Sequence, residues 1–227
     1  MALLYEREIM FEDVDSAPMH ASIVVLVTDY IARVRSIKLP LGAPLGRLTF
    51  SRYHVHVVIG APEDCNPFDI EGEHVFFVDR CERVRQLGDN HYQIVYEGDT
   101  DDEAGFTQWA KMCAEFFTLM QCNIDMVCVD YGELRTALDS CNGKILRFEQ
   151  LPYDQHDVVP YHKHTGSEYR VIYGCLCGNV DLMLRQWVDL SEVLESRNPG
   201  VVMTKLAVTF GSYSPPVMML LGEAVAD

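Results

Sequence analysis

The chain has 227 residues, 48% of them hydrophobic, and its 34 acidic and 18 basic residues give a formal net charge of −16. This length and apolar content can form a sizeable core, in one large domain or two modest ones. The acidic balance excludes nucleic acid as an expected partner, because binding to a phosphate backbone needs clustered Lys and Arg. Since the sequence shows neither a signal peptide nor an apolar run near about 18 residues, we expect a soluble, cytoplasmic protein.

The first hundred residues alternate between apolar runs and turn signals. Four strands are predicted, at residues 22–27, 52–59, 73–79 and 91–96, and the second reads as half-buried because apolar residues alternate with His54 and His56. Short helices are predicted at residues 28–37 and 81–87, a Pro- and Gly-rich loop at 39–46 and a turn at 61–66. Strands that alternate with helices predict a sheet that is at least partly parallel, with helices packed on it.

A long amphipathic helix is predicted from about residue 103 to residue 120. Acids between residues 99 and 103 complement the positive end of its dipole. One side is apolar and carries Phe106, Trp109, Ala110, Cys113, Phe116, Phe117 and Met120. This stripe could bind a partner, but its helical spacing is more typical of a face turned to the core.

Between residues 126 and 138 an apolar strand passes directly into a helix. The strand ends at Asp130, and Glu133 follows three residues later at the start of the helical pattern. Acids at this place are favoured by the free N–H groups of a helix start, so Asp130 can be a helix cap with Glu133 as its capping-box partner. The local sequence therefore leaves a purely structural role open for both carboxylates.

The C-terminal half continues as a strand, a helix and two strands. The predicted ranges are 169–178 for the first strand, 179–195 for the helix, and 201–212 and 217–224 for the last strands, with a break at 213–216. Apolar residues of the helix segment, Leu182, Trp187, Leu190 and Leu194, are predicted to pack on the sheet.

These segments, taken together, resemble FtsZ and the tubulin superfamily. Residues 126–138 are similar to the synergy loop and following helix, where a V-D-F-x-D-V-R-T-type stretch carries acids into the nucleotide pocket of the next subunit. Asp130, Tyr131, Glu133 and Arg135 stand in the corresponding stretch, so the resemblance implies that they bind a partner. The strand, glycine, helix and final strands match the order of the family's C-terminal domain. The expected fold is α/β, with a mixed, partly parallel sheet, helices on its faces and an FtsZ-like second half.

The resemblance covers residues 98–225, and the chain departs from the family outside and inside this range. It divides the chain into a reduced or diverged N-terminal α/β region, 1–97, and a central helix with an FtsZ-like C-terminal domain, 98–227. Family GTPases bind phosphate through a G-G-G-T-G-T-G-type loop, which residues 1–100 lack. In addition, Glu133 stands where the family has Asp, and Cys128 where Asn is usual.

The resemblance with these departures implies a structural or regulatory protein that does not hydrolyse nucleotide. It would act by subunit contact on a tubulin- or FtsZ-like partner, or on a second copy, and cap or modulate a filament. No catalytic residue, nucleotide-binding residue, metal or cofactor is expected.

An unrelated α/β enzyme or a ligand- or metal-binding protein is the alternative. Asp130 and Glu133 would then be candidates for acid–base chemistry. His156, His162 and His164 lie in one polar loop, and Cys175 and Cys177 share a strand face, where two sulfurs could hold a soft metal. The eight cysteines form no C-x-x-C pair, so we expect reduced thiols packed in the core.

Overall fold

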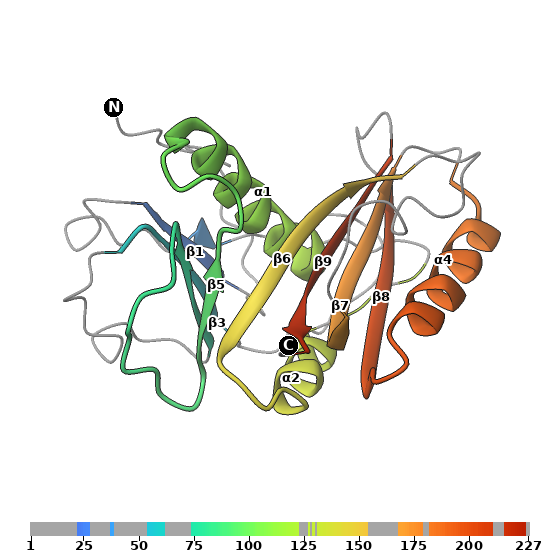
Figure 1. Cartoon of the computed structure of the whole chain (residues 1–227). Coiled ribbons are helices and arrows are strands. Elements are labelled where there is room, and N and C mark those ends of the chain that lie inside the picture. Colours follow the sequence, from blue (N-terminus) through green and yellow to red (C-terminus); the bar gives the residue numbers. More distant parts are fainter. Residues whose placement is uncertain are drawn as a thin grey trace, which may run out of the picture. The chain divides into compact units, whose positions relative to one another are not determined.

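The computed structural model describes residues 22–27, 37–38, 54–61, 74–122, 127, 129, 131–153, 168–178, 182–210 and 216–225 (Figure 1). The chain divides into a first unit, Met1–Ala114, and a second unit, Glu115–Asp227. This division falls inside helix α1 (Glu103–Cys122). The domain boundary expected from the sequence lies between residues 97 and 98, and it stays a prediction.

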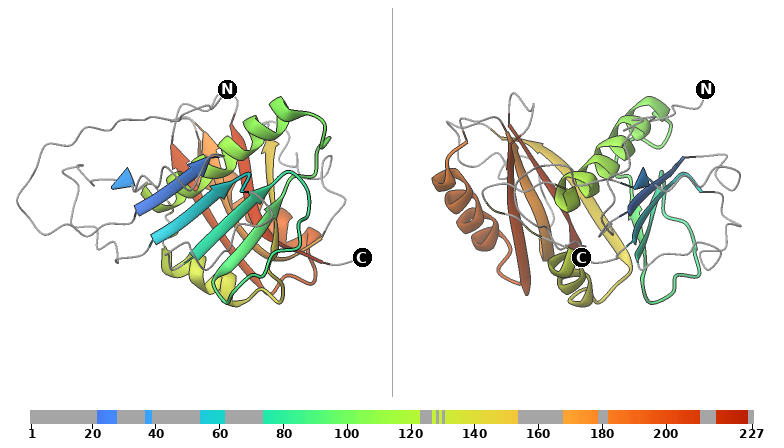
Figure 2. Two further views of the ribbon diagram at one scale, coloured as in Figure 1. Left: turned by 90° about the vertical axis from the view of Figure 1, so that its left-hand side faces the viewer. Right: turned by 180° about the vertical axis from the view of Figure 1, so that it is seen from behind.

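The first unit contains a largely parallel sheet. Its strands are β1 (Ser22–Val27), β2 (Ile37–Lys38), β3 (His54–Ile59), β4 (His74–Asp79) and β5 (His91–Val95). They lie in the order β2-β1-β3-β4-β5, in which β2 is antiparallel to β1 and the other neighbours are parallel (Figure 2, left). The four predicted strands and the partly parallel sheet are thus confirmed.

The prediction of a half-buried strand at residues 52–59 was wrong. Every β3 side chain that the structure describes is buried, including His56, which was expected on an open face. Parallel strands are covered on both faces, so their burial does not follow the polar and apolar alternation of the sequence.

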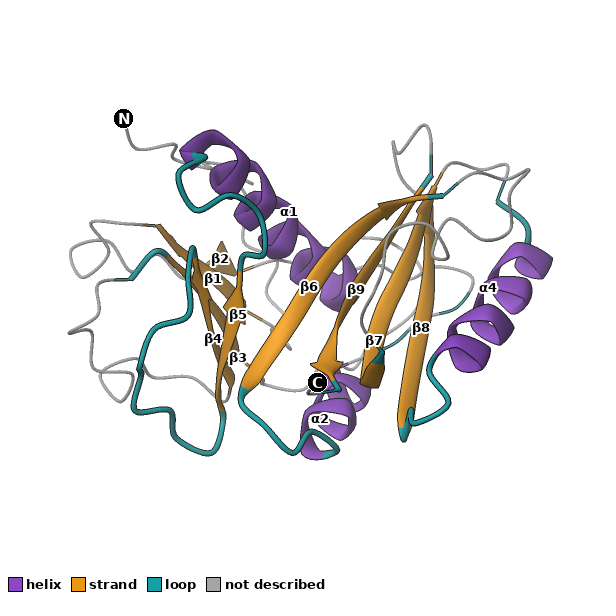
Figure 3. Cartoon of the chain, in the orientation of Figure 1, coloured by secondary structure: helices purple, strands orange, loops and turns teal. Residues whose placement is uncertain are grey.

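The predicted helix at residues 81–87 was also wrong. The connection from β4 to β5 is irregular along its whole length (Figure 3). Leu87 packs on a buried cluster of Val58, Ala61, Val75 and Phe77, and the Arg85 guanidinium lies 4.7 Å from the centre of the Phe77 ring. Short helices are marginal by themselves, so these tertiary contacts decide the backbone path. The helix expected at 28–37 lies outside the described residues except Ile37, which is in β2, and the predicted loop at 39–46 lies wholly outside them.

Helix α1 confirms the prediction of a long helix with one core face. The residues of the predicted apolar stripe are buried, apart from Trp109, which is half-buried and packs on Tyr96 and Phe106 of the first unit. In the second unit, the Phe116 ring lies 5.5 Å from Phe148 and 5.9 Å from Tyr173, measured between ring centres.

The second unit is a mixed sheet with helices on both faces. Its strands are β6 (Ile145–Pro152), β7 (Tyr169–Gly178), β8 (Met203–Phe210) and β9 (Val217–Ala224). They lie in the order β6-β9-β7-β8, where β7 and β8 are parallel and β9 is antiparallel to both of its neighbours. Helix α4 (Leu184–Arg197) covers one face, and α2 (Tyr131–Asp139) contacts β7 and β8 on the other (Figures 1 and 2). The expected mixed α/β architecture is confirmed.

Two parts of the second unit differ from the prediction. Strand β6 was not predicted. Helix α4 begins at Leu184 rather than at residue 179, because Leu182 is buried against the sheet and the Met183 N–H is 2.7 Å from Gln186 Oε1, which closes the first turn. The predicted packing of Leu182, Trp187, Leu190 and Leu194 on the sheet is confirmed. No helix in the described ranges is long and apolar enough to cross a membrane.

Candidate functional site

Of the four residues that the sequence singled out as a partner-binding site, Tyr131, Glu133 and Arg135 lie in α2. Asp130 is outside the described residues, and of Tyr131 only the backbone, which begins α2, is described. Leu134, Ala137 and Leu138 are buried and hold α2 on the sheet. Glu133 is half-buried and Arg135 is exposed. Because residues two apart on a helix do not share a face, these two side chains point in different directions.

Glu133 is held by a residue that the sequence did not reveal. Lys205 Nζ of β8 lies 3.1 Å from Glu133 Oε1, although the two residues are 72 positions apart. Their side chains keep 31% and 34% of their surface exposed, Lys205 and Glu133 respectively, so the pair lies at the edge of solvent. The alternation in β8 could have given a signal: Leu206 and Val208 pack in the α4 cluster, which assigns Lys205 to the α2 face.

Arg135 is oriented differently from Glu133. Its Nε is 3.8 Å from the Asp139 carboxylate one turn later, and both side chains are more than half exposed. A pair of this kind adds little stability. We use the name "α2 surface" for Glu133, Arg135 and Lys205, which the structure gathers at α2 and the neighbouring β8.

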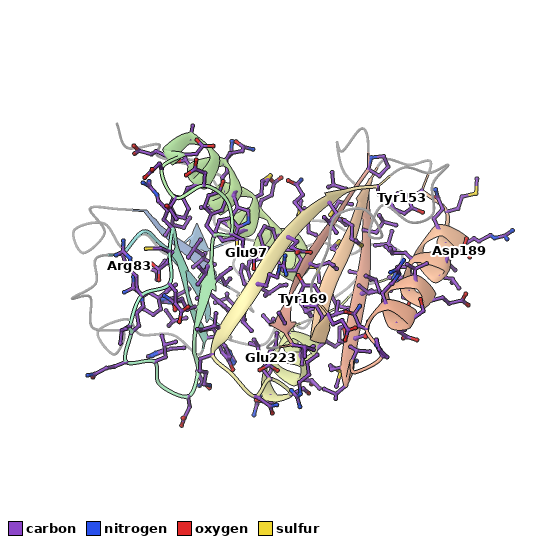
Figure 4. The ribbon with its side chains drawn as sticks, in the orientation of Figure 1. Arg83, Glu97, Tyr153, Tyr169, Asp189 and Glu223 are labelled. Carbon is purple, nitrogen blue, oxygen red and sulfur yellow. The ribbon has the colours of Figure 1, made fainter. Side chains whose placement is uncertain are left out.

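The other end of α2 is fixed by Glu223 of β9. The Glu223 side chain is labelled in Figure 4. Its carboxylate accepts hydrogen bonds from the backbone N–H of Asn142 at 2.9 Å and of Gly143 at 2.6 Å, and pairs with Arg170 at 3.0 Å. Arg170 also donates to the carbonyl of Ser140. These bonds tie the turn after α2 to β7 and β9, and so they set where α2 lies on the sheet. No local pattern in the sequence signalled them.

Burial, and next the Glu223 carboxylate, raise the pKa of Cys141 from 9.0 to about 12. Cys141 lies in the turn that Glu223 holds. The thiol therefore stays protonated at neutral pH. Its reactivity depends on how closely Glu223 lies against this turn.

The carboxyl ends of β3 and β4 in the first unit are closed by a second charged network. Arg85 donates to both oxygens of Asp79, at 2.8 and 2.7 Å, and Gln93 Nε2 donates to Asp79 at 2.7 Å. Arg83 and Arg85 both donate to the carbonyl of Ala61. The N–H of Gly60, whose φ of 64° suits glycine, donates to the Val78 carbonyl. Open α/β sheets bind ligands at this kind of edge, but here Asp79, Arg85 and Gln93 bond to one another, and Arg85 also bonds to the Ala61 carbonyl.

The residues of the alternative, metal-binding interpretation are placed only in part. His156, His162 and His164 lie outside the described residues. Cys175 and Cys177 share a strand face as predicted, with their sulfurs 3.5 Å apart, and both are buried free thiols. Within the described part of the chain, no three or more His, Cys, Asp or Glu residues gather around a possible metal position.

No family model and no curated protein matches the sequence. The structure is similar to FtsZ from M. jannaschii, solved as an empty dimer, with a TM-score of 0.53, 10% identity, and coverage of 78% of this chain and 64% of that chain. It is less similar to TubZ from Bacillus thuringiensis serovar israelensis in a GTPγS-form protofilament, with a TM-score of 0.48, 8% identity, and coverage of 82% and 64%. For CetZ1 from Haloferax volcanii the TM-score is 0.41, the identity 11%, and the coverage 77% and 56%. This chain thus spans less than two thirds of the length of the FtsZ chain, and its fold is of the tubulin/FtsZ type.

Proposed function

We propose that the chain is a structural or regulatory protein that docks on a tubulin- or FtsZ-like partner and caps or modulates its filament. The docking residues would be Asp130, Tyr131 and the α2 surface. One observation carries this proposal: in a fold of the FtsZ type, the helix that follows α1 presents the partly exposed carboxylate of Glu133 at its first turn. A second copy of the chain is a possible partner, since the similar FtsZ was solved as a dimer.

As a second part of this proposal, the chain itself neither binds nor hydrolyses GTP. Two observations support this part. Residues 1–100 contain no glycine-rich run. The edge formed by the ends of β3 and β4 is filled by Asp79 and Arg85. Such a protein would occupy a filament end and offer no nucleotide to the next subunit.

The docking role is tested by removing the two charges while sparing the helix. Asn caps a helix nearly as well as Asp, and Gln keeps the hydrogen-bonding geometry of Glu. Asp130→Asn with Glu133→Gln should therefore leave the melting temperature within a few degrees. Co-sedimentation and GTP turnover of an FtsZ-type protein from the same organism are measured with wild-type and substituted chains. We expect wild type to alter assembly or turnover, and the double variant to lose this effect.

A matched control is Asp189→Asn with Glu192→Gln, which removes the same charge from α4 on the opposite face of the second-unit sheet. This control should behave as wild type. Equal behaviour of the wild type and the α2 variant would leave Asp130 and Glu133 as helix-capping residues. Titration of the purified chain with GTP tests the other part, and saturable micromolar binding would contradict it.

A further inference from the structure

Two buried thiols lean toward each other on an inner strand of the second-unit sheet. Cys175 and Cys177 lie on β7, which has β9 on one side and β8 on the other (Figure 1). Residues two apart on a strand are separated by about 6.6 Å along it, yet the two sulfurs are 3.5 Å apart. Both side chains are therefore directed to a common point. They are 1% and 0% exposed, and neither cysteine is in a disulfide.

A third sulfur belongs to the same face of the sheet. Met219 of β9 is the register partner of Cys175, and directly opposed residues of an antiparallel pair share a face, with Cβ atoms about 5 Å apart. Leu176 and Met218 pack in the α4 cluster, so Cys175, Cys177 and Met219 lie on the opposite face. Met219 is fully buried. Two thiols and one thioether thus share one buried region of the second unit.

These sulfurs fit a soft metal ion. At a metal–sulfur distance of about 2.3 Å, the two cysteine sulfurs subtend an angle of roughly 100° at the ion, so an ion can bind both with little movement. Zn²⁺ takes its protein ligands from Cys, His, Asp and Glu, whereas thiolate together with thioether selects Cu(I). Such a set holds only two cysteines, in keeping with the finding that no larger His, Cys, Asp and Glu group exists among the described residues.

Binding of the ion would replace a proton. The Cys177 thiol donates to the sulfur of Cys175, so one proton already lies between the two sulfurs. Cu(I) with one thiolate has no net charge, which a buried site favours. The displaced proton would leave near the end of β7, where Cys177 pairs with the partly exposed Val217. Because a thiol must lose its proton, the affinity for Cu(I) should rise with pH.

We propose that Cys175, Cys177 and Met219 bind one Cu(I) ion, with the two cysteine sulfurs as the main ligands and the thioether as the third. This inference goes beyond the proposed docking function and uses none of its residues. Failure of the copper site would leave the docking role intact, and failure of the docking role would leave the copper site intact.

The experiment titrates the reduced chain with Cu(I) under nitrogen, with bathocuproine disulfonate as the competing chelator. Wild type should hold one Cu(I) ion against the chelator. Cys175→Ala with Cys177→Ala should weaken this binding on the order of a hundredfold or more. Met219→Leu keeps both thiols and should weaken it on the order of tenfold.

A matched control is Cys81→Ala with Cys113→Ala, which also removes two thiols, one exposed and one buried. This control should bind Cu(I) as wild type does. Equal affinity of the wild type and the Cys175–Cys177 variant, or an equal loss in the control, would overturn the site. Tighter binding of Zn²⁺ than of Cu(I) would overturn the choice of metal.

X-ray absorption of the copper-loaded wild type gives a readout that does not depend on how the variants fold. Two or three sulfur neighbours at about 2.3 Å are expected. Copper bound mainly to nitrogen or oxygen would contradict the proposal. Circular dichroism without metal compares the folding of all variants, and if the Cys175–Cys177 variant is unfolded, Met219→Leu and the absorption spectrum decide.

Discussion

Each unit contains an ion pair between a carboxylate and a basic side chain. The two pairs have similar N–O distances but differ in burial. In the first unit, Asp79 and Arg85 are 2.7 Å apart and neither side chain is exposed. In the second unit, Glu133 and Lys205 are 3.1 Å apart and about a third of each is exposed. Gln93, the Ala61 carbonyl and the Phe77 ring complete the surroundings of the buried pair. Burial, more than the N–O distance, therefore decides whether an ion pair is a fixed part of the fold or a contact that a ligand can replace.

The Arg170–Glu223 pair lies between these extremes. The two atoms are 3.0 Å apart, and the side chains are 28% and 11% exposed. The three pairs form a graded series in one chain, in which the penalty for removing one partner should fall as exposure rises.

The largest effect is expected for Arg85→Met. It leaves the Asp79 carboxylate buried without its counter-charge, which typically destabilises a protein by about 3–5 kcal/mol. The free energy of unfolding is measured by urea denaturation. Asp79→Asn with Arg85→Met removes both charges and should restore more than half of the loss, because the amide oxygen introduced at position 79 can still accept the bond from Gln93. A single variant as stable as wild type would show that the buried network does not stabilise the first unit.

An intermediate effect is expected for Glu223→Gln. A Gln side chain keeps one acceptor oxygen and replaces the other with an NH2 donor. That NH2 group would face either Arg170 or the N–H groups of Asn142 and Gly143, and the donor that it faces would lose its acceptor. Loss of such charge-assisted bonds should reduce the free energy of unfolding by about 1–3 kcal/mol. A loss as large as that of Arg85→Met would break the graded series.

Cys141 gives a second measurement on the same variant. With a pKa of about 12, only about one thiol in ten thousand is ionised at pH 8. Because the folded-state pKa is raised, the contribution of this protonated thiol to stability is present below pH 9.0 and is lost as pH rises toward 12. Glu223→Gln removes one cause of the shift, so alkylation of Cys141 at pH 8 should become several-fold faster.

Peptide mapping by mass spectrometry follows each thiol separately. Cys81 is exposed and should react in every variant, whereas Cys113, whose pKa is raised by burial, should stay unreactive. Equal acceleration at Cys113 would indicate general loosening of the chain rather than a change in the turn held by Glu223.

The smallest effect on stability is expected for Lys205→Met. An exposed pair contributes about 1 kcal/mol or less, which for a chain of this size corresponds to a melting temperature shift of roughly 2–4 °C or less. The difference from wild type should shrink further in about 1 M salt, where the screening length is near 3 Å. The loss caused by Arg85→Met should persist in the same salt, since water and ions do not reach that pair.

Local pattern was sufficient for much of the fold. The bounds of β1, β7 and β9 agree with those predicted, and the core face of α1 follows from helical spacing. These segments are long or strongly patterned, so their own side chains decide both the element and its buried side. The resemblance to FtsZ rested on the order of such segments, and the structure confirms the fold.

Weaker local signals failed where distant residues decide the backbone. Residues 81–87 were predicted as a helix, yet Arg83 and Arg85 reach Ala61 and Asp79 and hold the segment in an irregular path. Strand β6 was missed although Leu146 and Phe148 alternate with the ion pair of Arg147 and Glu149. Its pairing with β9 supplies the backbone partners that a short alternating run does not itself specify.

Local pattern alone places Glu133 at the start of a helix, because the apolar spacing of Leu134, Ala137 and Leu138 is a property of neighbouring residues. The surroundings of Glu133 depend instead on how distant strands pair. Lys205 is 72 positions from Glu133, and Glu223 is 81 positions from Asn142, so neither contact exists until β8 and β9 have paired with β7. No periodic pattern in the sequence predicts which two residues form an ion pair. The strength of the pair depends on its burial, which is a property of the packed sheet.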